Sequence, residues 1–350
     1  MLGLAAANEL GRRGRDVVCL EQDEVGEVRS CSKGESRLLR LSHADPFYVR
    51  LAAQAKLGWE QLEAESGRQL LVPVGVVIVG DGAGDFFSAS SAGGVTVEWL
   101  AARELRDRFP EFHFDCGGLY EEGACVVLAR DVLDLFTESR SVELHEHTRV
   151  TRIRETDNGV TIEAQNRSYD CKVAIVCVGA WSGDLARQIG LIGWNRLTPS
   201  VVPVMYLRPR SGSLEGVPAF IELGGHRSWG VPTPTRGTYK VGLDIIGDVV
   251  DPATVSLILN DAERRKLADA SAGLLHGFEE RPLASERCMY ANGPHDDFVI
   301  DRVGRIVMGA GTSAHGFKFG PVLGGLLADL AEGKEPSVSA ERFSFERLVT

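Results

Sequence analysis

Residues 305–330 read RIVMGAGTSAHGFKFGPVLGGLLADL, so that an apolar strand pattern, a turn of small residues and an apolar helix pattern follow one another. Small residues from Gly309 to Ala314 would let the backbone approach a ligand closely. The helix expected at Val322–Leu330 would direct its N-terminal amides towards that ligand. Lys318 would add a positive charge beside it, although read alone this lysine is more typical of a surface cation. This stretch predicts a ligand site at the end of a buried strand.

The beginning of the chain carries the later half of a second nucleotide-binding signature. Leu2–Gly11 is an alanine-rich amphipathic helix pattern that opens on a glycine, and Asp16–Glu21 is a short apolar run that ends in an acid. This order is typical of the second half of a dinucleotide-binding βαβ unit. Gly3 would be the last glycine of the G-x-G-x-x-G pattern, and Glu21 would bind a ribose hydroxyl.

The strand and the two glycines expected before Gly3 are not among the 350 residues. Their amides would carry a pyrophosphate at the helix N-terminus, so two expectations arise. Either the given sequence starts within the unit, for example at a misplaced start codon, or the chain has lost the site. On the first expectation, residues 1–350 alone would bind the dinucleotide poorly or fold badly.

The composition sets broad limits on function. A chain of 350 residues, 44% hydrophobic and 25% charged, can bury one large core or two interleaved cores. A net charge of −11 without a basic stripe argues against nucleic acid or an anionic membrane surface as a partner. There is no run of about 18 apolar residues and no signal-peptide pattern, so we expect a cytoplasmic protein. Seven cysteines without a C-x-x-C pair predict neither a disulfide framework nor a metal site.

Helical and strand patterns alternate through the rest of the chain, which predicts an α/β fold. Helices are expected at 46–65, 98–107, 126–138, 184–189 and 255–275, and strands at 71–79, 142–144, 150–153, 160–164 and 172–178. Gly75 should bend the strand region in which it lies. Strand patterns dominate from 197 to 246 and predict a separate antiparallel sheet. The run 172–189 places a Gly-Ala-Trp turn after an apolar strand, where a doubly wound sheet binds ligands.

Six short motifs occur in an order that is specific as a set. They are SRLLR at Ser36–Arg40, VGAW at Val178–Trp181, YKVG at Tyr239–Gly242, RCMY at Arg287–Tyr290, HDDFVID at His295–Asp301 and HGFKF at His315–Phe319. Together with the front of the chain, this set resembles the monomeric sarcosine oxidase or N-methyl amino acid oxidase family, within the D-amino-acid-oxidase-like flavoproteins. The resemblance covers nearly the whole chain and says little about the particular substrate.

The resemblance implies a two-domain α/β (α+β) fold, in which a Rossmann-like FAD-binding domain interleaves with an antiparallel-sheet substrate domain. The implied boundaries are 1–72, 128–195 and 294–350 for the FAD-binding domain, and 73–127 and 196–293 for the substrate domain. The implied reaction oxidises the carbon–nitrogen bond of a small amine or amino acid that carries a carboxylate, giving an imine. Oxygen then accepts the electrons and becomes hydrogen peroxide. We expect a monomer.

The resemblance also assigns roles near the reacting atoms. Arg40 and Lys318 match the pair that grips the substrate carboxylate, which suits a guanidinium fork beside a point charge. Cys288 matches a site of covalent FAD attachment, and the adjacent Arg287 would supply the cation that a thiolate needs. Lys240 matches a lysine that assists oxygen through a preorganised positive charge. Read locally, these residues are more typical of a solvated basic face, a small buried thiol and a strand lysine.

The other matched residues would bind FAD. They are Gly3, Glu21, Lys33, Ser36, Arg37, Gly179, Trp181, Gly311, His315, Gly316 and Phe317, in addition to Cys288 and Lys318. Two positions depart from the family pattern. Asp244 stands where sarcosine oxidases have a histidine, and this anion argues against sarcosine itself as the substrate. Lys33 replaces a histidine of the flavin loop.

Three hypotheses of function remain open from the sequence. The first is an FAD-dependent amine or amino-acid oxidase, which would be yellow, would bleach with substrate and would release peroxide. The second is a flavin dehydrogenase of the same fold that passes electrons to a quinone or carrier protein, against which Lys240 argues. The third is a non-catalytic remnant, suggested by the missing glycines, which would stay colourless.

Overall fold

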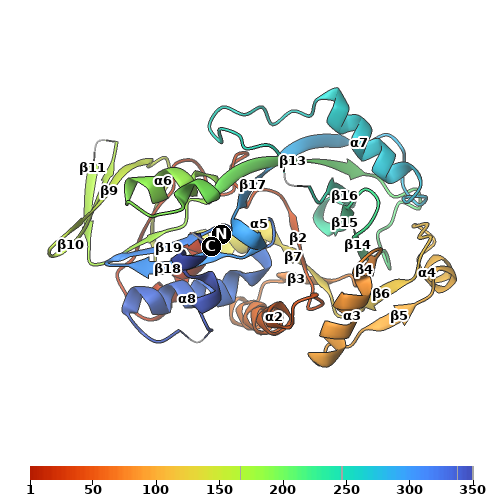
Figure 1. Cartoon of the computed structure of the whole chain (residues 1–350), viewed down its shortest axis with the longest axis horizontal. Coiled ribbons are helices and arrows are strands. Elements are labelled where there is room, and N and C mark those ends of the chain that lie inside the picture. The colour runs from red at the N-terminus through yellow and green to blue at the C-terminus, as the bar shows by residue number, and fades with distance from the viewer. Residues whose placement is uncertain (166, 246, 337, 349–350) are drawn as a thin grey trace.

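The computed structural model describes residues 1–165, 167–245, 247–336 and 338–348 of the chain (Figure 1). Short parallel strands with their helices form one half of the elongated molecule, and a large sheet with its own helices forms the other. The predicted combination of an α/β part with a separate, mainly antiparallel sheet is therefore confirmed.

Two sets of strands carry the parallel part of the fold. β1 (Val18–Leu20) pairs in parallel with β8 (Glu143–His145), and β12 (Ala174–Val176) pairs in parallel with β19 (Ile306–Ala310). β18 (Val299–Val303) adds to β19 in the antiparallel direction. Among the described residues, no strand is hydrogen-bonded to both β1 and β12. β12 and β19 are short and entirely apolar, as strands covered by helices are.

Two helices from opposite ends of the chain pack together beside the parallel strands. α1 (Leu2–Arg12) and α8 (Gly320–Glu332) approach so closely that a Cβ at Gly324 would lie 2.8 Å from the Cβ of Ala5. Only a residue without a side chain fits this crossing. The contact brings the two ligand-binding signatures of the sequence into one region.

The large sheet contains eight strands. Its order is β17 (Ala284–Asn292), β13 (Thr198–Leu207), β16 (Thr238–Leu243), β15 (Ser228–Thr233), β14 (Ala219–Glu222), β4 (Val76–Val79), β6 (Gly118–Glu121) and β5 (Glu98–Leu100). All neighbours are antiparallel except β14 and β4, which are parallel. One face packs on aromatic side chains that include Phe112, Phe220 and Tyr239, which form a core of their own.

Two small antiparallel sheets complete the strand content. One contains β2 (Ser36–Leu39), β7 (Cys125–Leu128) and β3 (Leu71–Pro73), and the other contains β9 (Val150–Thr156), β10 (Gly159–Ala164) and β11 (Arg167–Cys171). Gly75, between β3 and β4, has φ +70°, so the predicted bend is present. The other helices are α2 (Pro46–Ser66), α3 (Ala83–Ala92), α4 (Ala102–Arg108), α5 (Ala129–Thr137), α6 (Ser182–Gln188) and α7 (Asp261–Ala272).

Helix α2 shows why its prediction was accurate. The Asp45 carboxylate accepts a hydrogen bond from the Phe47 amide at 2.8 Å, and Pro46 occupies the first turn, where its missing N–H costs nothing. Gly67 ends the helix with φ +66°. Both signals are visible in the sequence.

Several other predicted elements were wrong in type or extent. The helix predicted at 98–107 begins as strand β5, and the helix predicted at 126–138 begins inside strand β7. The helix predicted at 255–275 starts only at Asp261, where Asn260 caps it, and α3 and β11 were not predicted. The last residue of the predicted strand block, Ile246, lies outside the described residues. None of the described helices is long and apolar enough to cross a membrane.

Candidate active site

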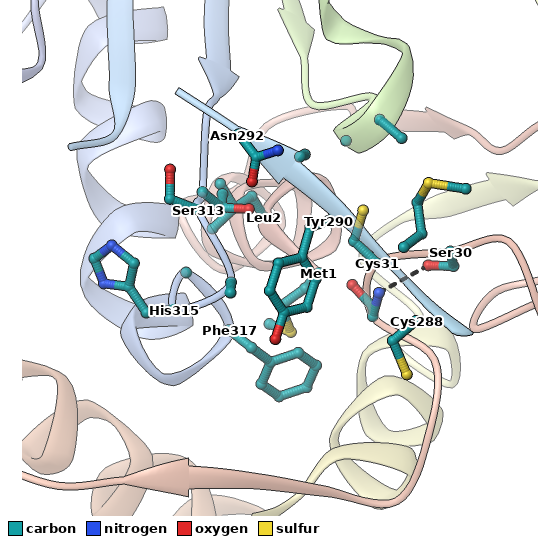
Figure 2. A pocket seen from close by; sticks show the side chains of 18 of the residues that line it. Met1, Leu2, Ser30, Cys31, Cys288, Tyr290, Asn292, Ser313, His315 and Phe317 are labelled. Atoms are coloured by element: carbon teal, nitrogen blue, oxygen red, sulfur yellow. Dashed lines mark hydrogen bonds between the residues drawn. The ribbon is translucent and has the colours of Figure 1, made fainter. Parts of the chain in front are cut away.

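A large cavity of about 1660 Å³ lies where the parallel strands and the eight-stranded sheet meet. It exceeds the range of roughly 300–1,000 Å³ typical of a small-molecule pocket, so it has room for a dinucleotide and a substrate together. The predicted site residues that line it are Glu21, Lys33, Ser36, Arg37, Arg40, Gly179, Trp181, Lys240, Asp244, Cys288, Gly311, His315, Gly316, Phe317 and Lys318. Figure 2 shows Met1, Tyr290 and Phe317 gathered around one part of this space.

Gly3 is the one predicted site residue that does not line the cavity. A Cβ at Gly3 would lie 3.4 Å from the Cβ of Cys177, just after β12, so this glycine allows close packing of a helix on a strand. Glu21 follows β1 and accepts a hydrogen bond from the Asp23 amide at 3.2 Å. Burial raises the pKa of Glu21. Its carboxylate is placed to accept hydrogen bonds from a ligand in the cavity.

The turn after β19 has a strained backbone. Ser313 and Ala314 have φ values of +41° and +66°, a region that non-glycine residues rarely adopt. The Ser313 amide donates to the carbonyl of Ala291 at 2.8 Å, and the Ser313 hydroxyl accepts from the Gly293 amide at 3.0 Å. A Cβ at Gly311 would lie 2.9 Å from the Cα of Gly293. Two backbone segments therefore meet closely at the wall of the cavity.

The loop before β2 is folded around Arg37. Its guanidinium donates to the carbonyl of Ser36 at 2.9 Å and to the carbonyl of Cys31 at 3.1 Å. It also lies over the ring of Phe317, 5.2 Å from the centroid. Arg37 thus joins the predicted flavin loop to the HGFKF turn, which comes from the opposite end of the sequence.

One face of β17 presents polar side chains to the cavity. Cys288 and Tyr290 line the cavity, and Glu286 points to the same face because side chains alternate along a strand. The Glu286 carboxylate forms an ion pair with Lys33 and accepts a hydrogen bond from the Tyr206 hydroxyl at 2.8 Å. These donors hold the pKa of Glu286 below its usual range, although burial opposes them.

The predicted role of Arg287 beside the Cys288 thiol was wrong. Arg287 points to the other face of β17, where its guanidinium pairs with the Glu263 carboxylate at 2.9 Å. The alternation of side chains along a strand separates neighbours in sequence, so adjacency did not mean contact. Lys240 lies on the same face of the sheet as Cys288, because their partners on β13, Tyr206 and Val202, are four residues apart and point to one side.

Lys240 is a buried cation, with 7% of its surface exposed. Its Nζ lies 5.6 Å from the Trp229 ring and 6.0 Å from the Tyr206 ring. It has no hydrogen bond or ion pair to any described residue. Burial lowers the pKa of Lys240, and the nearby Cys288 acts in the opposite direction. A buried lysine without a carboxylate partner is costly, which is typical of a functional site.

Arg40 and Lys318 lie together at another part of the cavity wall. Lys318 is 6% exposed and makes no ion pair within the described chain. Burial and the Arg40 charge hold the pKa of Lys318 well below its usual range. Burial also lowers the pKa of Arg40 to about 10, although the negative charges of Glu121 and Asp244 act to raise it. A buried ammonium and a partly buried guanidinium that repel each other form a site for an anion.

Glu121 was not predicted from the sequence, and it organises the segment after Arg40. Its carboxylate accepts hydrogen bonds from the Leu41 amide at 2.8 Å, the Ser42 amide at 2.9 Å and the Ser42 hydroxyl at 2.6 Å. Ser42 in turn accepts a hydrogen bond from Arg40 through its carbonyl oxygen. The carboxylate oxygens of Glu121 therefore accept hydrogen bonds from this loop and not from Lys318.

Asp244 lies at the mouth of the cavity and pairs with Arg227. The Arg227 guanidinium donates to the Asp244 carboxylate at 2.8 Å, and the two side chains are 60% and 53% exposed, respectively. Asp296 also lines the cavity, and burial together with the Asp244 charge raises the pKa of Asp296. The mouth thus carries two carboxylates and one guanidinium.

Two histidines stand near Lys318. His315, which the sequence predicted, hydrogen-bonds through Nε2 to the Asp296 carbonyl at 2.9 Å, and burial lowers its pKa to about 3. His43 was not predicted as a site residue. It lines the cavity and is 8% exposed. Only its position three residues after Arg40 could have drawn attention to it.

The cavity fits FAD by its size and by its side chains, because it places two buried lysines without carboxylate partners against a space large enough for the dinucleotide. Glu21, the Arg37 loop, the turn after β19, Cys288 and Lys240 line this space and are the groups that would hold the cofactor. In the described parts of the chain, no three His, Cys, Asp or Glu side chains are arranged to hold a metal ion.

Comparisons with known proteins agree with this geometry. The family of FAD dependent oxidoreductases (DAO) matches residues 1–330. The monomeric sarcosine oxidase of Streptomyces avermitilis is 32% identical, over 94% of this chain and 91% of that protein. The N-methyl-L-tryptophan oxidase of Salmonella agona is 27% identical, over 99% of this chain and 96% of that protein. The solved structure of NikD, an unusual amino acid oxidase essential for nikkomycin biosynthesis, has a TM-score of 0.84 at 21% identity, over 98% of this chain and 94% of that chain.

Proposed function

Because the chain belongs to the family of FAD dependent oxidoreductases, and within it to the sarcosine oxidase and N-methyl amino acid oxidase group, we propose that it oxidises an N-alkylated or primary amino acid at the carbon–nitrogen bond. The product is the imine. The electron acceptor is oxygen, which is released as hydrogen peroxide. FAD, when bound, supplies the redox chemistry, and the residues of the chain orient the substrate and place charge.

The pairing of Arg40 with Lys318 carries this proposal. Lys318 is buried and Arg40 is partly buried at the cavity wall, and neither has a carboxylate partner at ion-pair distance among the described residues. A substrate carboxylate would offset their repulsion and raise the pKa of Lys318. The substrate is therefore an amino acid rather than a simple amine.

Lys240 has a separate role at the β17 face of the cavity. Its buried ammonium would stabilise the negative charge that develops on oxygen during reduction, because a preorganised charge in a site without water needs no reorganisation. This role favours the oxidase over a dehydrogenase with another electron acceptor.

We also propose that the molecule divides as the sequence indicates. Segments 1–72, 128–195 and 294–350 would form the FAD-binding domain, and 73–127 and 196–293 the substrate domain. The eight-stranded sheet supports this division, because all of its strands come from the latter two segments.

The direct test is turnover by the FAD-loaded protein in air with a panel of N-methyl and primary amino acids. We expect oxygen consumption and peroxide release in equal amounts, and no comparable rate with amines that lack a carboxylate. Reduction of an artificial dye without peroxide would support the dehydrogenase instead. A colourless protein that oxidises none of the panel would refute both.

Cys288 is the proposed point of covalent FAD attachment. The thiol lies on the cavity face of β17, and Lys240 replaces Arg287 as the cation that would favour its thiolate. We expect acid precipitation to leave the yellow colour in the protein pellet, and Cys288→Ser to release it to the supernatant. Cys116→Ser, at an exposed cysteine, is the control. An unmodified mass of the intact, active wild-type chain would exclude the covalent bond and leave bound FAD possible.

A further inference from the structure

His43 carries an unpartnered polar atom at the cavity wall. Three buried side-chain polar atoms of the described residues lack a hydrogen-bond partner, namely His43 Nε2, Ser90 Oγ and Thr238 Oγ1. Of these three residues, only His43 lines the cavity. A buried donor or acceptor without a partner costs free energy, and native proteins rarely keep one unless a ligand or water meets it.

The surroundings of His43 place it beside the proposed carboxylate site. The His43 ring packs against Tyr48 and Phe319, with centroid distances of 5.6 and 5.9 Å. The Lys318 Nζ lies 5.3 Å from the centroid of the same Phe319 ring. Arg40 precedes His43 by three residues on one loop. The charges of Arg40 and Lys318 act on the imidazole, so the three groups lie near one another although they come from two segments of the chain.

Most hydrogen-bond donors of Arg40, Lys318 and His43 have no acceptor within the described residues. Arg40 donates to the Ser42 carbonyl, while Lys318 and His43 have no hydrogen-bond acceptor within the described residues. Glu121 is the carboxylate whose charge acts on Lys318, but it accepts its hydrogen bonds from Leu41 and Ser42. A carboxylate has about four lone-pair positions, so it can accept from all three donors at once.

We propose that His43 is a third carboxylate-binding residue, whose Nε2–H donates a hydrogen bond to the substrate carboxylate held by Arg40 and Lys318. The inference rests on the proposed function only in taking the bound anion to be the substrate. Burial and the charges of Arg40, Lys318 and His315 hold the pKa of His43 well below its usual value. The imidazole is therefore neutral at pH 7 and can donate through one nitrogen without adding a third charge.

Binding of benzoate and of benzamide to the FAD-loaded protein, measured by calorimetry, tests this role without turnover. The two probes share a shape, and only benzoate carries the anion. We expect His43→Phe, which keeps an aromatic ring against Tyr48 and Phe319, to weaken benzoate binding by about tenfold or more, because a hydrogen bond to a charged group is lost. Benzamide binding should change by less than about twofold.

His43→Gln and His276→Phe are the matched variants. A glutamine amide can occupy the position of Nε2, so His43→Gln should keep benzoate binding within about threefold of wild type. His276 is exposed and does not line the cavity, so His276→Phe should change nothing. Equal losses for benzoate and benzamide in His43→Phe would show a packing role only. Unchanged benzoate binding would show that Nε2 meets a buried water only, and either result overturns the inference. If His43→Phe weakens binding of benzoate but not of benzamide, and the wild-type protein oxidises no amino acid, the role of His43 in binding a carboxylate stands and the proposed function is refuted.

Discussion

Lys240 and Lys318 are buried and Arg40 is partly buried, and the burial of these basic residues is better explained by ligand binding than by stability. Removing a charge from water costs several kcal/mol, and a buried ion is retained when another group compensates it. Within the described chain, these three side chains find ring faces and a carbonyl oxygen rather than carboxylate partners. A carboxylate substrate and a reduced oxygen species would supply the missing negative charge.

Lys240 should matter for one half of the reaction. We expect Lys240→Met to slow the reaction of the reduced enzyme with oxygen by about 100-fold, because a preorganised charge next to oxygen is removed. Anaerobic reduction by substrate should change far less. Stopped-flow traces of each half separate the two effects. Lys172→Met, at an exposed lysine between β11 and β12, is the control, and equal slowing of both halves by Lys240→Met would contradict the assignment.

Asp244 should influence which substrate is preferred. Together with Asp296 it makes the cavity mouth net negative despite Arg227, so a substrate with a distal cationic group should be favoured. We expect Asp244→His to raise kcat/KM for sarcosine relative to an N-methylated basic amino acid by about tenfold. Asp244→Asn, which keeps the shape without the charge, should move the ratio in the same direction. If the ranking of the two substrates stays unchanged in both variants, Asp244 has no part in selection.

The sequence identified residues through motifs and missed residues that act through packing. Lys240, Lys318 and Cys288 were found because each lies in a recognisable run of neighbours. Glu121 and His43 have no local signal, since their roles arise from contacts between segments distant in sequence. Arg287 was misassigned because its neighbour in sequence lies on the opposite face of the strand.

At the scale of elements, a cluster of charges joins α1 to the end of α8. Arg13 and Arg15 donate to the Glu332 carboxylate at 2.8 and 2.7 Å, and Lys334 donates to it at 2.7 Å. Lys334, Arg13 and Arg15 lower the pKa of Glu332 to about 2, from an ordinary value of 4.5. A lowered carboxyl pKa stabilises the fold above the ordinary pKa, and this contribution is lost as the pH falls towards the lowered one.

Glu332→Gln should therefore destabilise the protein in a pH-dependent way. We expect a loss of about 1 kcal/mol in the free energy of unfolding at pH 7, since the partners Arg15 and Lys334 are largely exposed and solvent screens them. The difference from wild type should shrink between pH 5 and pH 2. Denaturant unfolding at several pH values measures it, with Glu335→Gln as the control. A difference that is constant with pH would show that the ion pairs contribute nothing.

The boundaries of helices and strands were predicted well where local signals exist. They were predicted badly where pairing with a distant strand determines the secondary structure. The helix predicted at 46–65 from its apolar spacing agrees with α2, whose ends also carry local signals, the cap at Asp45 and the stop at Gly67. The residues of β5 and β7 were taken for helix, because their apolar spacing continues into α4 and α5 without a break. Only the pairing of these strands with β6, β2 and β3 fixes their state, and no short window of sequence records it.

At the scale of the whole molecule, the site exists because separate parts of the chain meet. The fold class was predictable, since alternating patterns and six ordered motifs span nearly the full length. The cavity itself was not, because its walls combine the turns after β12 and β19 with β16 and β17 of the large sheet. Each part alone would be a common turn or strand, and only their combination forms a space large enough for both a dinucleotide and a substrate.

The central claim is that an amino acid is oxidised in this cavity with its carboxylate held by Arg40 and Lys318. The most direct measurement is the anaerobic bleaching of the FAD-loaded protein by an N-methyl amino acid and by the corresponding N-methylamine without the carboxylate, in wild type and in Lys318→Met. We expect the amino acid to bleach wild-type enzyme, the amine to react poorly, and Lys318→Met to weaken apparent affinity for the amino acid alone by about 30-fold or more. Equal reactivity of the two compounds with wild type, or unchanged kinetics in Lys318→Met, would contradict the account.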